Sequence, residues 1–204
     1  RGVAHTAPFS PWSFGYYLSQ ALPLICLGEL FFLAFFFSKE ERLLRPLTQA
    51  TPIRQRRYAA LRCGAVLTAT LVLCLCVAVL AVGFYVSLFG WVDYGELILP
   101  ALLTLIPPIV FCLGAGMMLS RFNHTMIYAL MAAVILLTVL PLPPAINFSS
   151  SSFFSQFPLT VEKLDPAFHV PGWLAVSKIA LAFLGSTFTI SSINMQDYKL
   201  DKSK

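Results

Sequence analysis

No charged residue occurs between Arg62 and Asp93, and this long apolar run most limits what the chain can fold into. A helix needs about 20 predominantly apolar residues to cross the hydrocarbon core of a bilayer, and this run exceeds that length. Only 11% of the 204 residues are charged, whereas soluble domains contain about 25%. We therefore expect an all-α fold, namely a polytopic helical membrane protein, and no soluble domain.

Other apolar runs extend this pattern along the chain. Together with the run above they predict five transmembrane helices, at about residues 16–37, 63–89, 97–120, 125–140 and 173–190. Two long connections remain, a highly charged segment at 38–61 and a segment rich in Ser, Phe and Pro at 142–172. We treat residues 1–204 as a single transmembrane domain.

Positive residues collect on one side of this arrangement. Eleven of the 14 Lys and Arg residues fall in segment 38–61, at Arg62, in the connection 121–124 or after residue 190. The opposite side holds only Arg1 and Lys163. Because cytoplasmic loops carry an excess of Lys and Arg, we predict a multi-pass protein of the plasma (inner) membrane. Segment 38–61 and the C-terminus would be cytoplasmic, and segment 142–172 would be external.

The same topology places the residues before the first span outside the cell. We therefore expect one further span ahead of residue 1, which would give six spans with both ends inside. The net charge of +5 is explained by this sidedness and by anionic lipid headgroups, so we expect no nucleic-acid partner.

Motifs for catalysis and for cofactors are missing. The sequence has no Walker A loop, no zinc-ligand helix motif and no nucleotide-binding glycine fingerprint. We expect no enzymatic activity of its own, no bound cofactor and no metal. The small residues at 114–116 indicate helix packing. The five cysteines are interpreted as small apolar core residues without disulfides, namely Cys26, Cys63, Cys74, Cys76 and Cys112.

Two charged residues interrupt the predicted spans. Glu29 lies in the first span and Lys178 in the last. A charge in hydrocarbon is costly, so such residues usually face a bundle interior or a water-filled path. Lys178 is near a span end, and its long side chain is expected to extend toward the membrane surface. A glutamate cannot readily do so, which makes Glu29 the candidate pathway residue, with a structural hydrogen bond as the alternative.

Segment 38–62 reads SKEERLLRPLTQATPIRQRRYAALR. Ser38 and Glu41 match a capping box, which predicts a helix start. Leu43 and Leu47 would share one face of that helix. Thr51 followed by Pro52 indicates a second helix start, which leads through Arg residues into the next span. A basic loop that binds lipid headgroups explains the arginines, but it leaves the acidic pair and the leucine face unexplained, so we favour a docking role.

This order of elements resembles the membrane (permease) subunits of ABC transporters of the type-2 export class. In that family, a charged segment of the form E-R…L…T-P…R-Y forms a coupling helix that docks onto a separate ATPase subunit. The matching residues here are Glu40, Glu41, Arg42, Leu44, Leu47, Thr51, Pro52, Arg57 and Tyr58. The family also has six spans and a helical piece outside before the last one, which segment 142–172 would supply.

The resemblance implies a membrane subunit of an ATP-driven exporter. Its partners would be an ABC ATPase subunit that binds ATP and Mg²⁺, a second permease subunit in a homo- or heterodimer, and membrane lipid. Substrates in this class include drugs, peptides, lipids and polysaccharides. Two alternatives remain open, an integral-membrane enzyme and a secondary transporter or structural membrane partner. The residues expected to couple the chain to the ATPase are Glu40, Glu41, Arg42, Leu43, Arg45, Leu47, Thr51 and Pro52.

Overall fold

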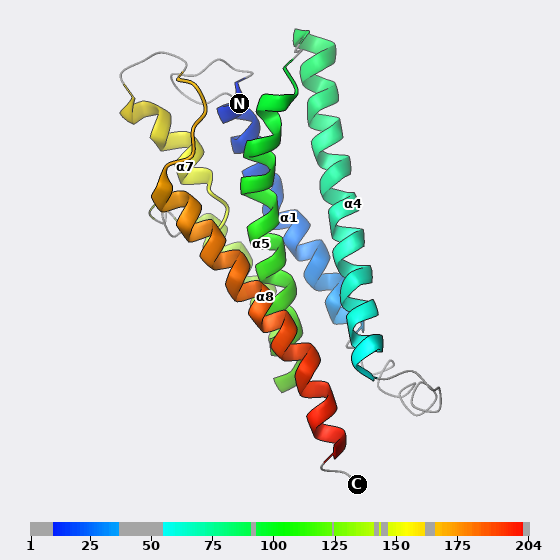
Figure 1. Cartoon of the computed structure of the whole chain (residues 1–204). Coiled ribbons are helices and arrows are strands. Elements are labelled where there is room, and N and C mark those ends of the chain that lie inside the picture. The colour runs from blue at the N-terminus through cyan, green and yellow to red at the C-terminus, as the bar shows by residue number, and fades with distance from the viewer. Residues whose placement is uncertain are drawn as a thin grey trace.

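A computed structural model describes residues 10–36, 55–90, 93–123, 125–140, 143, 147–161 and 166–201. Within these ranges the chain forms helices and no strand. The long helices lie alongside one another in an elongated bundle (Figure 1). Four of them are long and apolar enough to cross a membrane. The predicted all-α fold class is therefore confirmed.

The helices follow the predicted spans closely in position and less closely in length. Their bounds are α1 Pro11–Phe36, α4 Gln55–Phe89, α5 Gly95–Phe122, α6 Thr125–Val139, α7 Ser151–Gln156 and α8 Gly172–Asp201. A short 3-10 helix, η1 at Phe157–Thr160, continues directly from α7. Helix α8 extends beyond the apolar run that predicted the last span, because a helix need not end where its residues become polar.

Helix α1 begins at Pro11, earlier than the predicted first span. Ser10 precedes it and accepts hydrogen bonds from the backbone N–H of Ser13, to its hydroxyl at 3.4 Å, and of Phe14, to its carbonyl at 3.1 Å. Serine is a favoured N-cap residue, and proline is favoured at the first helical position. The Ser–Pro pair therefore starts the helix before the apolar run does.

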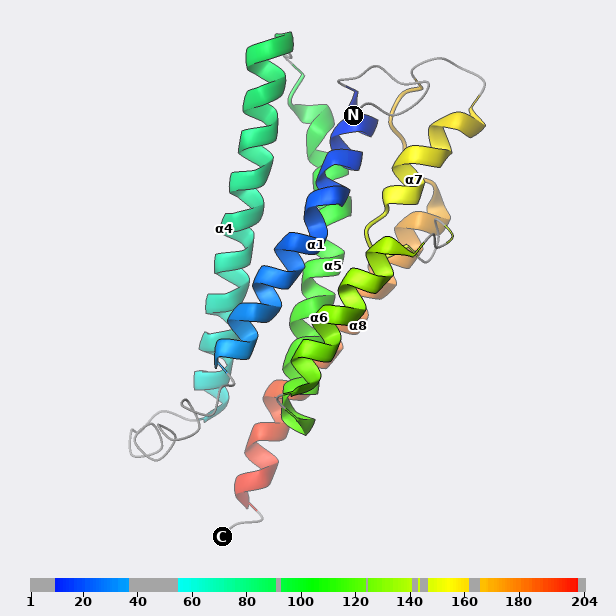
Figure 2. The ribbon, with the colours of Figure 1, turned by 180° about the vertical axis from the view of Figure 1, so that it is seen from behind.

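Proline does not interrupt the spans. Helix α1 continues through Pro23, and α5 continues through Pro100, Pro107 and Pro108. Helix α1 changes direction along its length (Figure 2), as expected for a helix that contains proline.

Helices α1 and α5 form the centre of the bundle. About half of the most apolar window of each is buried, 50% in α1 and 56% in α5, against 22% in α4 and 17% in α8. Helix α5 packs along both α1 and α8. At the α5–α8 contact, a Cβ added to Gly114 would lie 2.8 Å from the carbonyl carbon of Gly185. The predicted role of the 114–116 patch in close helix packing is therefore confirmed.

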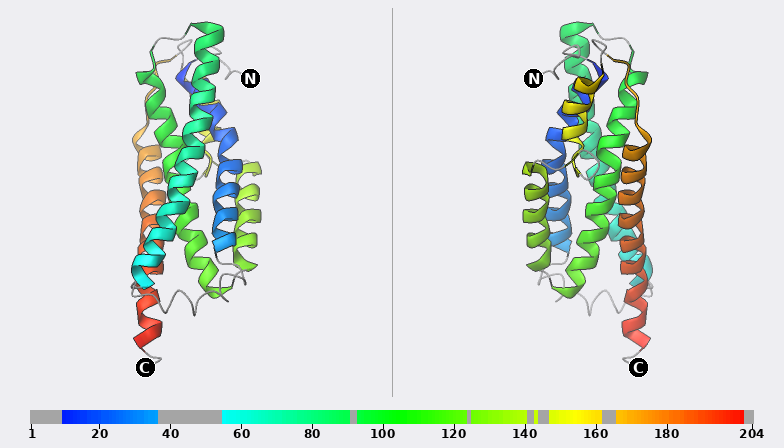
Figure 3. Two further views of the ribbon diagram at one scale, coloured as in Figure 1. Left: turned by 90° about the vertical axis from the view of Figure 1, so that its right-hand side faces the viewer. Right: turned by 90° about the vertical axis from the view of Figure 1, so that its left-hand side faces the viewer.

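The fourth predicted span is discontinuous. Helix α6 has 15 residues, which corresponds to about 22 Å at the usual helical rise, less than the roughly 30 Å of a hydrocarbon core. The chain then leaves the helix and forms α7 near the end of the bundle where α1 begins (Figures 2 and 3). Helices α6 and α7 both contact α1, so the two short helices together pack along α1.

Helix α7 is held to the start of α1 by an aromatic cluster. Trp12 lies within ring-contact distance of Phe153, Phe154, Phe157 and Phe168, and its indole N–H donates to the carbonyl of Pro166 at 2.8 Å. Gly15 leaves room for the ring of Phe154, since an added Cβ would lie 2.7 Å from its Cδ1.

Candidate functional site

Glu29 lies in the interior of the bundle. Its side chain is 1% exposed, and neither carboxylate oxygen has a hydrogen-bond partner among the described residues. A carboxylate charge moved from water into apolar surroundings is very costly unless it is paired. The carboxyl group is therefore expected to hold a proton or to balance a bound cation. The structural hydrogen bond weighed as its alternative role is not formed within the described part of the chain.

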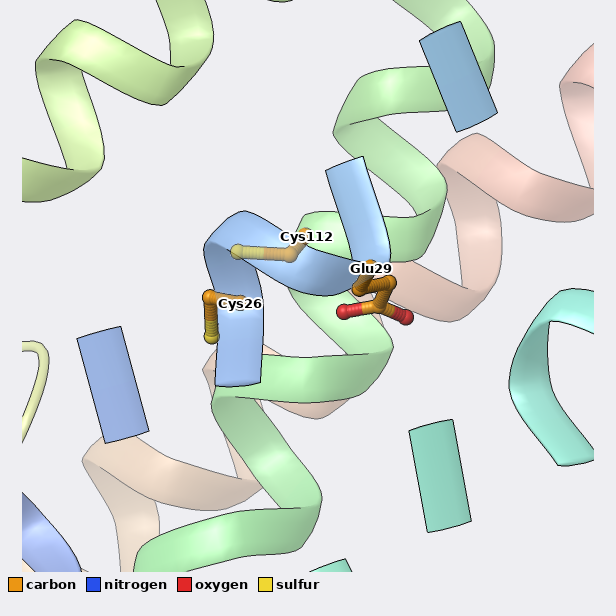
Figure 4. Close-up of side chains that lie close together, drawn as sticks. All are labelled: Cys26, Glu29 and Cys112. Atoms are coloured by element: carbon orange, nitrogen blue, oxygen red, sulfur yellow. The ribbon is translucent and has the colours of Figure 1, made fainter. Parts of the chain in front are cut away.

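Two cysteines lie beside this carboxyl group. Cys26 precedes Glu29 by one helical turn on α1, and Cys112 faces them from α5. Both cysteine side chains are fully buried. The two sulfur atoms and one carboxylate oxygen all lie within 4.8 Å of one another. One oxygen of Glu29 is turned toward the sulfur atoms and the other points away from them (Figure 4).

The location of this group follows from the helix geometry. Residues three apart on a helix are neighbours on one face, so the 26–29 spacing places both side chains toward α5. Cys112 reaches them because α1 and α5 pack closely along their length. At Gly116, one turn further along α5, an added Cβ would lie 2.7 Å from Cδ1 of Leu33. The small residue thus allows the two helices to approach near the group.

Two further thiols lie near the group on α4. Cys63 and Cys74 are close enough to Glu29 for electrostatic interaction. They are eleven residues apart, which corresponds to about 16 Å along the helix axis. The thiols of Cys63 and Cys74 are therefore too far apart to contact one and the same bound ion. All five cysteines are free, and Cys76 is exposed whereas the other four are buried.

Lys178 marks a second polar position in the interior. Its side chain is 4% exposed, and its Nζ donates to the backbone carbonyls of Asn147, at 3.1 Å, and Phe148, at 3.0 Å. The expectation that this side chain extends toward the membrane surface is wrong. Asn147 and Phe148 precede α7 and have their carbonyls outside any helix, and Lys178 of α8 donates to both of them.

Polar side chains also stabilise this break between α6 and α7. The side-chain oxygen of Asn147 accepts from the backbone N–H and the hydroxyl of Ser149, each at 3.0 Å. Its amide nitrogen donates to the hydroxyls of Ser151 and Ser152. Ser150 adopts a left-handed conformation with φ of 61°. Non-helical backbone at membrane depth is tolerated where it is buried in protein, and residues 147–150 are all buried here.

Glu29 is the only residue proposed from sequence as a site residue that falls within the described part of the chain. The others, Glu40, Glu41, Arg42, Leu43, Arg45, Leu47, Thr51 and Pro52, lie outside the described residues. Sequence analysis did not identify Cys26 and Cys112 as partners of Glu29, although the 26–29 spacing was visible. Comparisons of the chain with protein-family models, curated proteins and solved structures found no match.

Proposed function

We propose that this chain is the membrane-spanning subunit of an ATP-driven exporter of the type-2 ABC class. The proposal rests on the sequence of the charged segment and on one structural observation. The end of α1 and the start of α4, which flank residues 37–54 in the sequence, contact each other through Phe36 and Arg62. Arg62 Nη1 donates to the carbonyl of Phe36 at 3.2 Å. Its guanidinium also lies over the rings of Tyr58, at 4.4 Å, and Phe36, at 5.5 Å.

The contact between the end of α1 and the start of α4 is what a force-transmitting segment between these helices requires. A docked coupling segment acts on the spans only if its two ends are attached to them firmly. Arg62 on α4 is joined to Phe36 at the end of α1 by one hydrogen bond and one cation–π contact, and a cation–π contact contributes about 0.5–2 kcal/mol. A movement of the segment would therefore displace α1 and α4 together. Helix α1 in turn contacts α5, α6 and α7, so the displacement reaches most of the bundle.

The bundle supports the remaining features of the proposal. The ends of α1, α5 and α8 and the start of α4 lie at one end of the bundle, and α7 and the end of α4 lie at the other (Figures 1 and 2). The short helical piece α7–η1 precedes the last long helix, as in the family that the sequence resembles. ATP and Mg²⁺ would bind to a separate ATPase subunit, and a second permease subunit would complete the pathway.

A specific observation favours a second candidate function, secondary transport. Transporters of that kind often place binding sites at discontinuous helices near the middle of the membrane. The break between α6 and α7, with Lys178 buried against it, has this character. A secondary transporter needs no ATPase subunit, so the two functions differ in whether one associates with this chain.

The test is a substitution of the leucine face in the charged segment. Burying a leucine side chain is worth roughly 1.5–3 kcal/mol, and about 1.4 kcal/mol corresponds to a tenfold change in affinity. Leu43→Ala combined with Leu47→Ala is therefore expected to weaken association with a co-purifying ATPase by about a hundredfold or more. Affinity for the ATPase is measured with purified subunits in detergent or nanodiscs.

The control is the double change of Arg54 and Arg56 to Gln, which removes positive charges expected to attract lipid headgroups and leaves the leucine face and the motif residue Arg57 intact. The exporter proposal expects this control to bind the ATPase nearly as well as the unmodified chain. A leucine double variant that inserts normally and retains full coupled ATPase activity contradicts the proposal. An unmodified chain that transports without any ATPase supports secondary transport instead.

A further inference from the structure

We propose that Cys26, Glu29 and Cys112 form a binding site for a thiophilic divalent metal ion of the zinc class. The proposal does not depend on the exporter function. It rests on three potential ligand atoms that lie within 4.8 Å of one another. It rests equally on a carboxyl group that is 1% exposed and has no hydrogen-bond partner within the described part of the chain.

The distances suit coordination after a small adjustment. Zinc binds sulfur at about 2.3 Å and carboxylate oxygen at about 2.0–2.2 Å. In tetrahedral geometry these bond lengths place the ligand atoms about 3.5–3.8 Å apart. The three atoms in this group, all within 4.8 Å, therefore need only small side-chain rotations to reach a common ion. Two ligands share one face of α1, and the third comes from α5, so an ion would also join the two central helices.

The ligand types select the class of ion. Thiolates favour soft and borderline ions such as Zn²⁺, whereas Mg²⁺ and Ca²⁺ prefer sites made only of oxygen. Both thiols would bind as thiolates and release their protons to solvent. Three protein ligands leave one tetrahedral position open, unlike the four protein ligands of most structural zinc sites. That position would be taken by water or by a ligand that arrives with the ion.

The unpartnered carboxyl group is the strongest argument for an ion. Buried polar groups in proteins nearly always have a hydrogen-bond partner, and an exception calls for an explanation such as a bound water molecule or ion. Both oxygens of Glu29 lack such a partner among the residues that the structure describes. The facing helix brings the thiol of Cys112 within 4.8 Å of the carboxyl group, and a thiol is a weak hydrogen-bond donor but a strong metal ligand once deprotonated. A metal ion would use both thiols and the carboxylate at once.

The chain contains its own controls. Cys63 and Cys74 lie near Glu29 on α4 but do not belong to the group of three. Cys76 is exposed and also lies on α4. Substituting these residues leaves the three proposed ligands in place. Cys76→Ser is the best matched control, because it removes a thiol without changing the buried interior.

The test uses Co²⁺ as a spectroscopic probe for the full chain purified in detergent. Thiolate coordination gives Co²⁺ charge-transfer absorption in the near ultraviolet and intense visible bands in tetrahedral geometry. We expect these bands in the unmodified chain and in Cys76→Ser, and their loss when Zn²⁺ is added as a competitor. Cys26→Ser and Cys112→Ser should each weaken binding by at least about 100-fold, since loss of a mere outer-shell partner already costs 10–100-fold. Glu29→Gln should weaken it as well.

A second measurement avoids variants that fold poorly. X-ray absorption of the unmodified chain loaded with Zn²⁺ should show sulfur and oxygen neighbours together in the first coordination shell. Absence of the cobalt–thiolate bands in the unmodified chain overturns the proposal. So does a zinc shell made only of oxygen or nitrogen, or a Cys76→Ser variant that loses binding as fully as Cys26→Ser.

Discussion

Lys178 and the chain break that it contacts show how a single side chain can stabilise a discontinuous span. The break leaves the carbonyls of Asn147 and Phe148 buried, and the ammonium group donates to both. Buried carbonyls without a donor are costly. Burying the charge of Lys178 is unfavourable. It is offset by the hydrogen bonds that Lys178 donates to two backbone carbonyls outside any helix.

Replacing this lysine should destabilise the fold. Lys178→Met keeps an unbranched side chain and removes the donor that the carbonyls of Asn147 and Phe148 share. The Asn147 carbonyl then keeps a longer bond from the N–H of Ser150, at 3.4 Å. We expect the free energy of unfolding to fall by about 1–3 kcal/mol, the usual cost of leaving a buried polar group unsatisfied. The measurement is denaturant or thermal unfolding of the purified chain in detergent.

The control for this prediction lies on the same helix. Ser186 is exposed, and its hydroxyl donates only to the carbonyl of Ala182 within α8. Ser186→Ala should leave the unfolding midpoint nearly unchanged. An unchanged midpoint in Lys178→Met as well would show that the break does not need the lysine.

At the scale of elements, the contact between α5 and α8 depends on the absence of side chains. A Cβ on Gly114 would lie 2.8 Å from the carbonyl carbon of Gly185 and 3.0 Å from the hydroxyl oxygen of Thr189. The Gly185 carbonyl belongs to the backbone and cannot rotate away. Small residues allow this close approach, and in membranes such packing replaces the hydrophobic effect as the main source of helix association.

Adding one methyl group at this contact should separate the helices. Gly114→Ala is expected to lower the free energy of unfolding by about 1–3 kcal/mol, as is typical of overpacking. Gly83→Ala on α4 is the matched control, because nothing lies within 4 Å of its added Cβ. That control should be neutral or stabilising by up to about 1 kcal/mol, since alanine favours helix over glycine. Equal stability of the two variants would contradict the packing argument.

At the scale of the whole molecule, the bundle has two distinct ends. Helix α7 lies at one end, and the ends of α5 and α8 lie at the other (Figures 1 and 2). If the cation-rich end is cytoplasmic, as the positive-inside rule predicts, then α7 is external. The apolar and mostly exposed surfaces of α4 and α8 suit contact with lipid between the two ends.

This orientation can be tested by labelling intact cells with a membrane-impermeant thiol reagent. In a Cys76→Ser background, Gln156→Cys introduces an exposed thiol on α7, and Thr125→Cys introduces one at the start of α6. We expect immediate labelling at position 156 and labelling at position 125 only after the cells are permeabilised. The reverse pattern would invert the topology and remove the basis for a cytoplasmic coupling segment.

The helical membrane fold was determined by the sequence itself. Within a bilayer the backbone must satisfy its own hydrogen bonds, so an apolar run of sufficient length becomes a helix. The run between Arg62 and Asp93 therefore predicted α4, and the other runs predicted the positions of α1, α5, α6 and α8. The start of α1 was missed because its cause, the Ser10–Pro11 pair, is a local capping signal that precedes the apolar run.

Which residues meet inside the bundle was decided only by the tertiary structure. Lipid-facing and protein-facing positions are both apolar in a membrane helix, so the sequence pattern does not reveal which face is turned inward. Cys112 comes beside Glu29 because α1 and α5 pack closely. Lys178 meets carbonyls thirty residues earlier in the chain because α8 packs against the break after α6. Such contacts depend on the rotation and depth of whole helices, which hydrophobicity and length leave unspecified.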